Sequence, residues 1–243
     1  MKKIFFLILI IFIIYVFLNK DHDIIKVDLP VAKNYNFFID SEEVDNLEEV
    51  DNLEKEINLN IPFTSQAPTA NWEQPFQDSC EEVSILMVDY YYSEKEFLEK
   101  EEIENKIKDM VYWQENNWGG HFNLSIFKLK EFIESYFNYN VEIINNLNII
   151  KIKNYLDKGI PIIVPASGKK LNNPYFSNGG PEYHMLVIKG YLGDNFITND
   201  PGTKRGLNFI YTSENLLYSI ADWDIQKSHV NMGLKNGLII LPN

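Results

Sequence analysis

The stretch YHMLVIKGYLGDNFITNDPG, residues 183–202, decides the fold class. It predicts two strands, Tyr183 to Tyr191 and Asn195 to Asn199, because both runs are rich in β-branched and aromatic residues. The Gly-Asp pair at 193–194 predicts a tight hairpin between them, and Asp-Pro-Gly at 200–202 predicts a turn after the second strand. The core of the domain therefore contains an antiparallel hairpin.

Two polar residues of this hairpin are candidates for a catalytic pair. His184 begins the first strand and Asp200 follows the second, so antiparallel pairing brings them to the same end of the hairpin. A strand holds an imidazole in the fixed position that a general base needs, and a carboxylate can orient its second ring nitrogen. Each residue alone is more often a core histidine or a turn aspartate. Their predicted proximity is what indicates a shared function.

Outside the hairpin, helix patterns come before most strand patterns. Apolar residues at helical spacing predict helices over 80–92, 95–111, 124–137 and 148–158, the last ending at Gly159. Further strands are predicted at Ile160 to Pro165, Leu207 to Tyr211 and Gly237 to Leu241. This order predicts an α+β fold in which a helical lobe packs on an antiparallel sheet, with any site where the two meet.

Cys80 is the single cysteine of the chain, and it lies where a loop changes to a predicted helix. The unpaired N–H groups of a first helical turn stabilise a thiolate, so this position predicts a lowered thiol pKa and a nucleophile. The alternative is a buried structural cysteine, since free cysteine is among the most buried residue types. A lone cysteine excludes an internal disulfide and a CxxC redox site.

The polar and aromatic motifs occur in an order that resembles a known family. They are Ile61-Pro-Phe-Thr-Ser-Gln66-Ala-Pro, Trp72, Cys80-Glu-Glu-Val-Ser, Tyr183-His184-Met-Leu-Val-Ile-Lys-Gly190-Tyr and Asn199-Asp200-Pro-Gly202-Thr. Together they resemble papain-like cysteine peptidase family thirty-nine, in its stand-alone branch similar to bacteriocin leader peptidases, over roughly residues 60–240.

The resemblance implies a papain-like fold and a Cys–His–Asp peptidase. It implies that Cys80 is the nucleophile, His184 the base, Asp200 the orienting acid, and an upstream glutamine the oxyanion donor. It further implies a substrate such as a double-glycine-type leader or a cell-surface peptide. Glu81 stands where transporter-linked relatives usually have glycine, whereas the stand-alone branch often carries glutamate there.

Three glutamines compete for the oxyanion role. Gln66 matches the motif of the branch but precedes Cys80 by 14 residues, which requires the intervening loop to fold back. Gln74 has the six-residue spacing typical of papain-like enzymes, and Gln77 is nearer still. We favour Gln66, because the surrounding motif matches.

The N-terminus predicts a membrane segment. Lys2 and Lys3 precede an uncharged apolar run of 15 residues, Ile4 to Leu18, which is short for a membrane span and suits a secretory signal. The residues that follow the run offer no small-x-small cleavage site. We therefore expect an uncleaved anchor over 1–20, with the rest outside the cytoplasm of a bacterial cell; cleavage would make the protein secreted.

An acidic linker is predicted over 21–58 and the peptidase domain over 59–243. Nine carboxylates lie between Asp40 and Glu56, and the whole chain carries a formal net charge of -13. Clustered basic residues are absent from the sequence, which argues against nucleic acid as a partner. We expect no cofactor and no metal, because Cys80 and the histidines show no close ligand spacing.

We therefore expect a membrane-anchored, extracytoplasmic cysteine peptidase that cleaves a peptide or protein through a thioester acyl-enzyme. Two alternatives stay open. The first is a catalytically inactive module of the same fold that binds peptides or cell-wall material. The second is an amidase or acyltransferase that uses the same three residues.

Overall fold

The computed structural model describes residues 28–34, 56–96 and 99–242, and the predicted hairpin lies at its centre. Strands β4 (His184–Leu192) and β5 (Asn195–Asn199) pair antiparallel, with Leu192 opposite Asn195 across the two-residue turn. A register shift between Ile188 and Gly190 marks a bulge in β4. Because β4 begins with His184 and β5 ends just before Asp200, both residues lie at one end of the hairpin.

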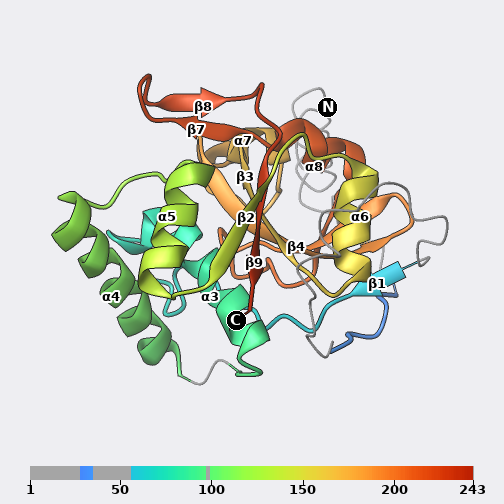
Figure 1. Ribbon diagram of the computed structural model, residues 1–243, viewed down its shortest axis with the longest axis horizontal. Coiled ribbons are helices and arrows are strands. Elements are labelled where there is room, and N and C mark those ends of the chain that lie inside the picture. The colour runs from blue at the N-terminus through green and yellow to red at the C-terminus, as the bar shows by residue number, and fades with distance from the viewer. Residues whose placement is uncertain (1–27, 35–55, 97–98, 243) are drawn as a thin grey trace, which may run out of the picture.

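The hairpin belongs to a seven-stranded sheet with the order β2-β9-β3-β4-β5-β6, in which β1 also pairs with β4. The remaining strands of this sheet are β1 (Glu56–Asn58), β2 (Asn140–Ile144), β3 (Ile162–Ala166), β6 (Phe209–Thr212) and β9 (Gly237–Leu241). Every pairing is antiparallel, as expected for the predicted α+β class. Figure 1 shows β9 between β2 and β3, so the strand nearest the C-terminus lies inside the sheet.

Strand β1 pairs with β4 at the end that β3 does not reach. Glu56 to Asn58 lie opposite Leu192 to Gly190, whereas β3 pairs with β4 only as far as Ile188. Gly190 makes this possible, because a Cβ at that position would lie 2.2 Å from the Ile57 carbonyl oxygen. A glycine inside a strand often marks such a close approach of a second backbone.

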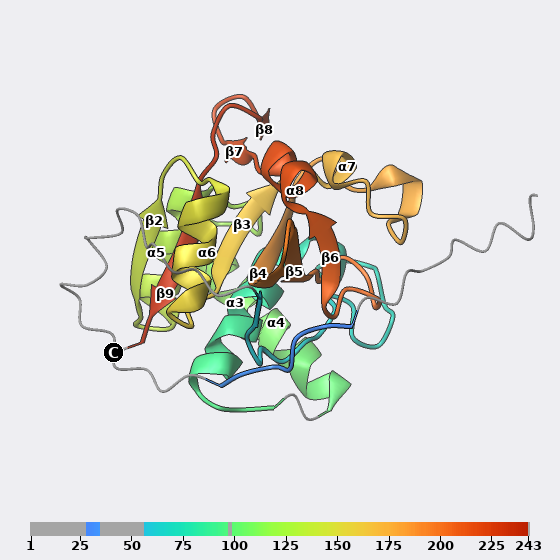
Figure 2. The ribbon, with the colours of Figure 1, turned by 90° about the vertical axis from the view of Figure 1, so that its right-hand side faces the viewer.

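The helices surround the sheet. They are α3 (Cys80–Tyr92), α4 (Lys100–Trp118), α5 (Ile126–Tyr136), α6 (Ile149–Asp157), α7 (Gly168–Leu171) and α8 (Ser213–Ser219), with 3₁₀ turns η1 (Phe76–Asp78) and η2 (Ser177–Gly179). Helix α3 packs on β4, while α5 contacts β2 and α6 contacts β3 and β4. In Figure 2, α5 and α6 lie beside the left part of the sheet and α3 and α4 lie below it.

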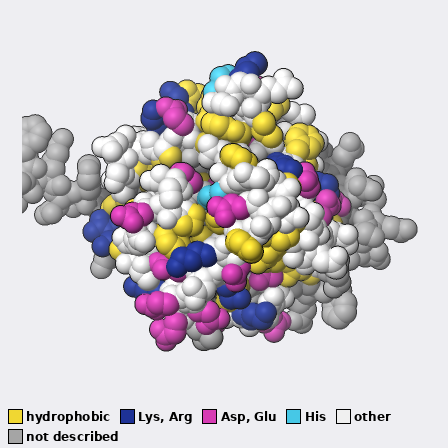
Figure 3. All heavy atoms as spheres, turned by 90° about the vertical axis from the view of Figure 1, so that its left-hand side faces the viewer, with side chains coloured by type: hydrophobic (Ala, Val, Ile, Leu, Met, Phe, Trp, Pro, Cys, Tyr) yellow, Lys and Arg dark blue, Asp and Glu magenta, His cyan; other side chains and the backbone are white. Residues whose placement is uncertain are grey.

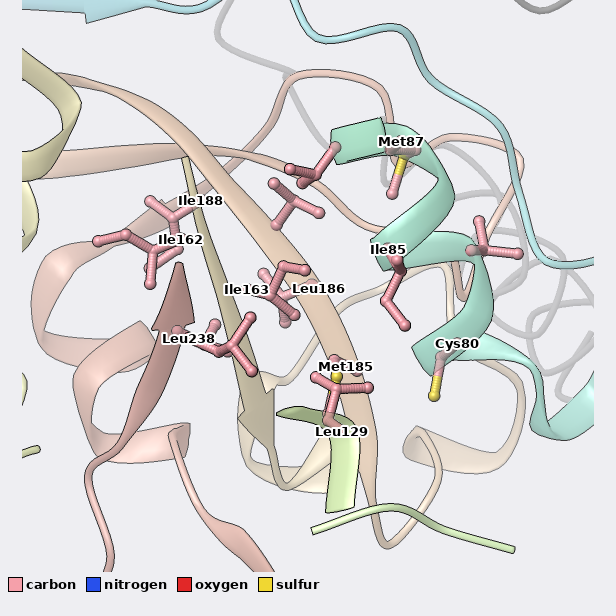
Figure 4. Close-up of a cluster of buried hydrophobic side chains, with 14 of the residues drawn as sticks. Cys80, Ile85, Met87, Leu129, Ile162, Ile163, Met185, Leu186, Ile188 and Leu238 are labelled. Carbon is pink, nitrogen blue, oxygen red and sulfur yellow. The ribbon is translucent and has the colours of Figure 1, made fainter. Parts of the chain in front are cut away.

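Helix α3 is the central helix of the core. Its residues are buried around most of its circumference, and only Asp89 and Tyr92 are partly exposed. Figure 4 shows Ile85 and Cys80 of this helix facing Leu186 and Met185 of β4. Because α3 is packed on several sides, its first residue has a defined position relative to the sheet.

The second helix differs from its predicted range of 95–111. It begins at Lys100 and continues to Trp118, where Gly119 adopts a left-handed φ of 78° and ends it. Its last two turns include Gln114, a fully buried polar residue that donates to Glu82. A buried glutamine does not appear in an apolar pattern, so the predicted range ends too early.

Four strands of the structure are missing from the predicted set. They are β1, β2 and the two strands of a small hairpin, β7 (Asp222–Asp224) and β8 (His229–Asn231). Each is short and carries polar residues, and β2 has only two buried side chains. Their pairing with distant or short partners is a tertiary effect that local patterns do not record.

The predicted anchor at residues 1–20 and most of the predicted linker lie outside the described residues. In the part of the chain that the structure does describe, none of the helices has the length and apolar character to cross a bilayer. Residues 28–34 run beside the start of the domain. Lys33 forms a parallel bridge with Leu59, and the Asn58 amide donates to the Pro30 carbonyl at 3.0 Å.

Candidate active site

Cys80 is the first residue of α3, as the sequence predicts, and its side chain is 5% exposed. Figure 4 shows its sulfur projecting from the start of the helix, near Met185. The thiol donates a hydrogen bond to Glu81 Oε2 at 3.0 Å. The nucleophile candidate is thus placed at a helix N-terminus, with a carboxylate in direct contact.

Burial, together with the neighbouring carboxylates, reverses the predicted shift of the thiol pKa. Burial raises the pKa of Cys80 well above its ordinary value, and the charges of Glu81 and Glu82 raise it further. A backbone hydrogen bond from Met185 opposes these effects only in part. The expectation of a lowered pKa is wrong for this arrangement, because the helix dipole is outweighed by desolvation and by two neighbouring carboxylates.

His184 and Asp200 form a buried pair. His184 Nε2 lies 2.8 Å from Asp200 Oδ1, with the histidine 1% and the aspartate 0% exposed. Asp200 also accepts hydrogen bonds from Tyr211 Oη at 2.6 Å, Asn173 Nδ2 at 3.1 Å and the Gly202 N–H at 3.0 Å. His184 and Asp200 therefore lie together, as predicted, and hydrogen bonds hold the carboxylate on several sides.

The surroundings of Asp200 keep it ionised. Burial alone raises the pKa of this carboxyl group, but the His184 ring and the hydrogen bonds from Tyr211 and Gly202 outweigh burial, so the pKa is lowered. An ionised Asp200 accepts from Nε2–H and leaves Nδ1 of the neutral ring as the nitrogen that can accept a proton.

The imidazole of His184 is also fixed by packing. The Phe176 ring meets it edge to face, with centroids 5.2 Å apart and an interplanar angle of 80°. A Cβ at Gly202 would lie 2.9 Å from His184 Cε1 and 2.8 Å from the Phe176 ring, so glycine is needed for this approach. The ring therefore has little freedom to turn away from Asp200.

An open cleft of about 650 Å³ brings the candidate residues together. Its walls include Cys80, His184 and Gln66, and Asp200 lies behind the histidine. The cleft also borders the 3₁₀ segment near Asn178, which follows α7. The candidate nucleophile and the candidate base thus border one cleft.

The three candidate glutamines differ in their placement. Gln66 and Gln77 line the cleft, whereas Gln74 is exposed and donates to Asp78 at 2.5 Å. Both amide hydrogens of Gln66 are engaged, because Nε2 donates to the carbonyls of Phe76 at 2.9 Å and Gln77 at 2.8 Å. The loop does fold back, as the choice of Gln66 required.

The sequence does not predict that Asn173, Tyr211 and Glu82 belong to the site. It also does not predict that Glu81 faces inward. Tyr211 lies on β6, opposite Phe196 of β5, so the register of a second strand pair decides where its hydroxyl points. The only sequence signal for Glu81 is its position directly after Cys80. Asn173 lies in an irregular loop after α7 and has no local pattern.

The comparisons with known proteins concern the family and the fold. A family model described as the Peptidase C39 like family matches residues 58–227, well over half of the chain. A crystal structure from Bacillus anthracis, described as that of a C39-like peptidase, superimposes with a TM-score of 0.51 at 14% identity. The match covers 78% of this chain and 99% of the other, and at that identity it shows a common fold. No curated protein matches the sequence. The chain belongs to the C39-like peptidase family.

Proposed function

We propose that this protein is a cysteine peptidase in which Cys80, His184 and Asp200 act together on a peptide bond. The observation that carries the proposal is the buried His184–Asp200 pair, with Nε2 and Oδ1 2.8 Å apart, whose histidine lines the same cleft as Cys80. This arrangement supplies a nucleophile, a base and an acceptor that fixes the tautomer of the base.

In the first half of the reaction, the Cys80 proton passes to His184 and the sulfur attacks the scissile carbonyl carbon. A carbon–sulfur bond forms, the carbon–nitrogen bond breaks, and the His184 ring gives its proton to the leaving amine. In the second half, the ring takes a proton from water, and the hydroxide attacks the thioester carbonyl. The carbon–sulfur bond then breaks, and the proton returns to the sulfur.

The negative charge of the tetrahedral intermediate needs donors beside the sulfur. The first turn of α3 supplies the backbone N–H of Cys80, which has no carbonyl partner within its helix. We propose Gln66 as the second donor. Its amide must then turn one N–H from the carbonyl of Phe76 or Gln77 toward the cleft, since both hydrogens are engaged in the resting site.

A peptide-library digest analysed by mass spectrometry tests the proposed peptidase activity. We expect cleavage that is abolished in Cys80→Ala and in His184→Ala. The matched control is His229→Ala, because His229 is an exposed residue of β8 and lies outside the cleft. Peptide binding without turnover would instead indicate a binding module, and products that carry an added amine would indicate an acyltransferase.

We also propose that residues 1–20 anchor the peptidase domain outside the cytoplasmic membrane. The support is the uncharged run of residues 4–18 after Lys2 and Lys3, together with the missing cleavage site. Cell fractionation should place the protein in the membrane fraction, and protease added to spheroplasts should digest its domain. A soluble mature protein that begins after Leu18 would overturn the anchor.

A further inference from the structure

A pair of buried carboxylates contacts the proposed nucleophile from its own helix. Glu81 is 1% exposed and Glu82 is 0% exposed, although both belong to the first turn of α3, where acidic residues normally face solvent. Glu81 Oε2 accepts the Cys80 thiol proton, and Glu81 Oε1 accepts the Leu124 N–H at 3.1 Å. Both oxygens of Glu81 are therefore held, and the carboxylate cannot swing away from the sulfur without breaking a second bond.

Glu82 adds a second negative charge behind the first. Its Oε1 accepts from the buried Gln114 amide and lies 3.3 Å from His121 Nε2. Its Oε2 is buried and has no hydrogen-bond partner among the described residues. One imidazolium can balance one carboxylate at most, so two ionised glutamates at this position leave an uncompensated buried charge.

The charges around Glu81 come from several segments. The titratable groups that act on it or on its neighbours are Cys80 and Glu82 on α3, His121 in the loop after α4, Tyr183 before β4, Asp78 on η1 and Asp222 on β7. Only His121 among them can become a cation. Burial alone lowers the pKa of His121, but the hydrogen bond to Glu82 and the nearby acids outweigh burial, so its pKa is raised.

Glu81 can therefore change its charge near neutral pH. Burial and then the charge of Glu82 raise the pKa of Glu81 to about 7. Above that pH, Glu81 is ionised and opposes a negative sulfur 3.0 Å away. Below it, the neutral carboxylic acid has a proton of its own and can donate to a negative sulfur.

We propose that Glu81 is a positioning residue that decides where the Cys80 proton lies. As a carboxylate it accepts the thiol proton and keeps the sulfur neutral. As a carboxylic acid it donates to the thiolate that forms when His184 takes the thiol proton. No proton leaves Glu81 in this step, so the carboxylic acid stabilises the ion pair of Cys80 and His184. The value of this role for catalysis rests on the proposed peptidase mechanism. The effect of Glu81 on the Cys80 thiol can be measured without a substrate.

The test is the rate of alkylation of Cys80 by iodoacetamide between pH 5 and pH 9. Cys80 is the single cysteine, so every alkylated chain reports this thiol. We compare the wild type with Glu81→Gln, which mimics the neutral acid, and with Glu101→Gln, a matched control at an exposed position of α4. At pH 8 we expect Glu81→Gln to react at least about tenfold faster than the wild type, since one unit of thiol pKa is a tenfold change in thiolate. Below about pH 6 the two rates should converge, and Glu101→Gln should follow the wild type throughout.

A ratio of Glu81→Gln to wild-type rates that does not change with pH would overturn the proposal, as would a slower variant. If Glu81→Gln does not fold, the wild type alone still decides. Its logarithmic alkylation rate should flatten as pH rises through about 7, and an unbroken slope through that region would overturn the role of Glu81. Peptide digestion separates the two proposals. If the alkylation rates depend on pH as expected but no peptide is cleaved, the peptidase function alone is disproved. If peptides are cleaved but the ratio of the alkylation rates does not change with pH, the role of Glu81 alone is disproved.

Discussion

Asp200, behind His184, accepts four hydrogen bonds, from one imidazole, one phenol, one amide and one backbone N–H. A carboxylate that is fully buried must find such partners, because an unpaired buried charge is costly. The four bonds fix the two oxygens, and the fixed oxygens select the tautomer of His184. The orientation of the His184 ring thus depends in part on Tyr211 and Asn173, which do not line the cleft.

Replacing this carboxylate should disable the base and leave the fold intact. In Asp200→Asn, the amide can present N–H to the ring, which stabilises the wrong tautomer of His184, and we expect kcat to fall by about 10³–10⁴-fold. The control is Tyr211→Phe, which removes one donor and keeps the charge, and its loss should be far smaller. Steady-state kinetics with circular dichroism check both. An Asp200→Asn enzyme with wild-type kcat would remove Asp200 from the mechanism.

The oxyanion donor can be identified by comparing two glutamines in the same cleft. We expect Gln66→Ala to lower kcat by about 10²–10³-fold with little change in KM, because the donor acts on charge that appears in the transition state. Gln77→Ala should cost less than about tenfold, since removal of a group that does not meet the oxyanion leaves the transition state unchanged. Thermal unfolding of both variants is needed, because Gln66 also binds two carbonyls of the following loop. A larger kcat loss for Gln77→Ala would exchange the two roles.

The sequence predicts the positions of Cys80, His184 and Asp200 because each follows from a local boundary: a helix start, a strand start and a strand end. It does not predict that Glu81 faces inward. First-turn acids usually lie in solvent, and the burial of this one depends on Leu124, 43 residues away, which supplies the N–H that receives it. Local patterns therefore locate Cys80 and give the wrong direction for the shift of its thiol pKa.

At the scale of elements, the contact between β1 and β4 depends on a single missing side chain. A Cβ at Gly190 would meet the Ile57 carbonyl at 2.2 Å, and neither backbone can move freely because β4 is paired on both sides. We expect Gly190→Ala to lower the free energy of unfolding by about 1–3 kcal/mol, as overpacking does in other cores. Urea denaturation measures this.

Gly193 offers a contrast within the same hairpin. It has a positive φ of 56°, and a Cβ added there would meet no neighbouring atom within 4 Å, so Gly193→Ala introduces backbone strain alone. We expect a loss of about 1 kcal/mol there. Equal losses at both glycines would show that β1 is not tightly bound against β4.

The predicted elements that agree best with the structure are those with a run of buried apolar residues, although α3 and β5 also bury polar residues. Helix α3 begins and ends at the predicted residues 80 and 92, and β5 and β9 also match their predicted bounds. The end of α4 was missed because the buried residue there is Gln114, and β2 was missed because it alternates polar and apolar residues over only five positions. The burial of such residues depends on partners that are distant in the sequence, and a local pattern does not record them.

At the scale of the whole molecule, acidic charge is spread over the surface. Figure 3 shows one face on which hydrophobic side chains occupy the middle and acidic side chains gather toward the lower edge. With a formal net charge of -13, the protein repels polyanions at low ionic strength. This is compatible with a peptide substrate and unfavourable for binding along a nucleic-acid backbone.

Two truncations should separate the peptidase domain from what precedes it. Removing residues 1–27 leaves the described contacts of 28–34 and β1 in place, and we expect wild-type thermal stability. Removing residues 1–58 deletes β1 and Ile57, which is fully buried, and should lower the free energy of unfolding by about 2 kcal/mol or more. Differential scanning calorimetry of the two shortened chains tests this. Equal unfolding temperatures would place β1 outside the cooperative unit.

The position of β9 bears on when the sheet is completed during synthesis of the chain. Residues 80–92, which carry the sulfur, leave the ribosome long before residues 237–241, yet the latter lie between β2 and β3 in the finished sheet. Until those last residues emerge, β2 and β3 have no common neighbour, and the sheet that positions His184 is divided by a gap. In the proposed peptidase, a nascent chain therefore carries Cys80 through most of translation before the sheet is complete, and so without the means to cut the polypeptides it meets.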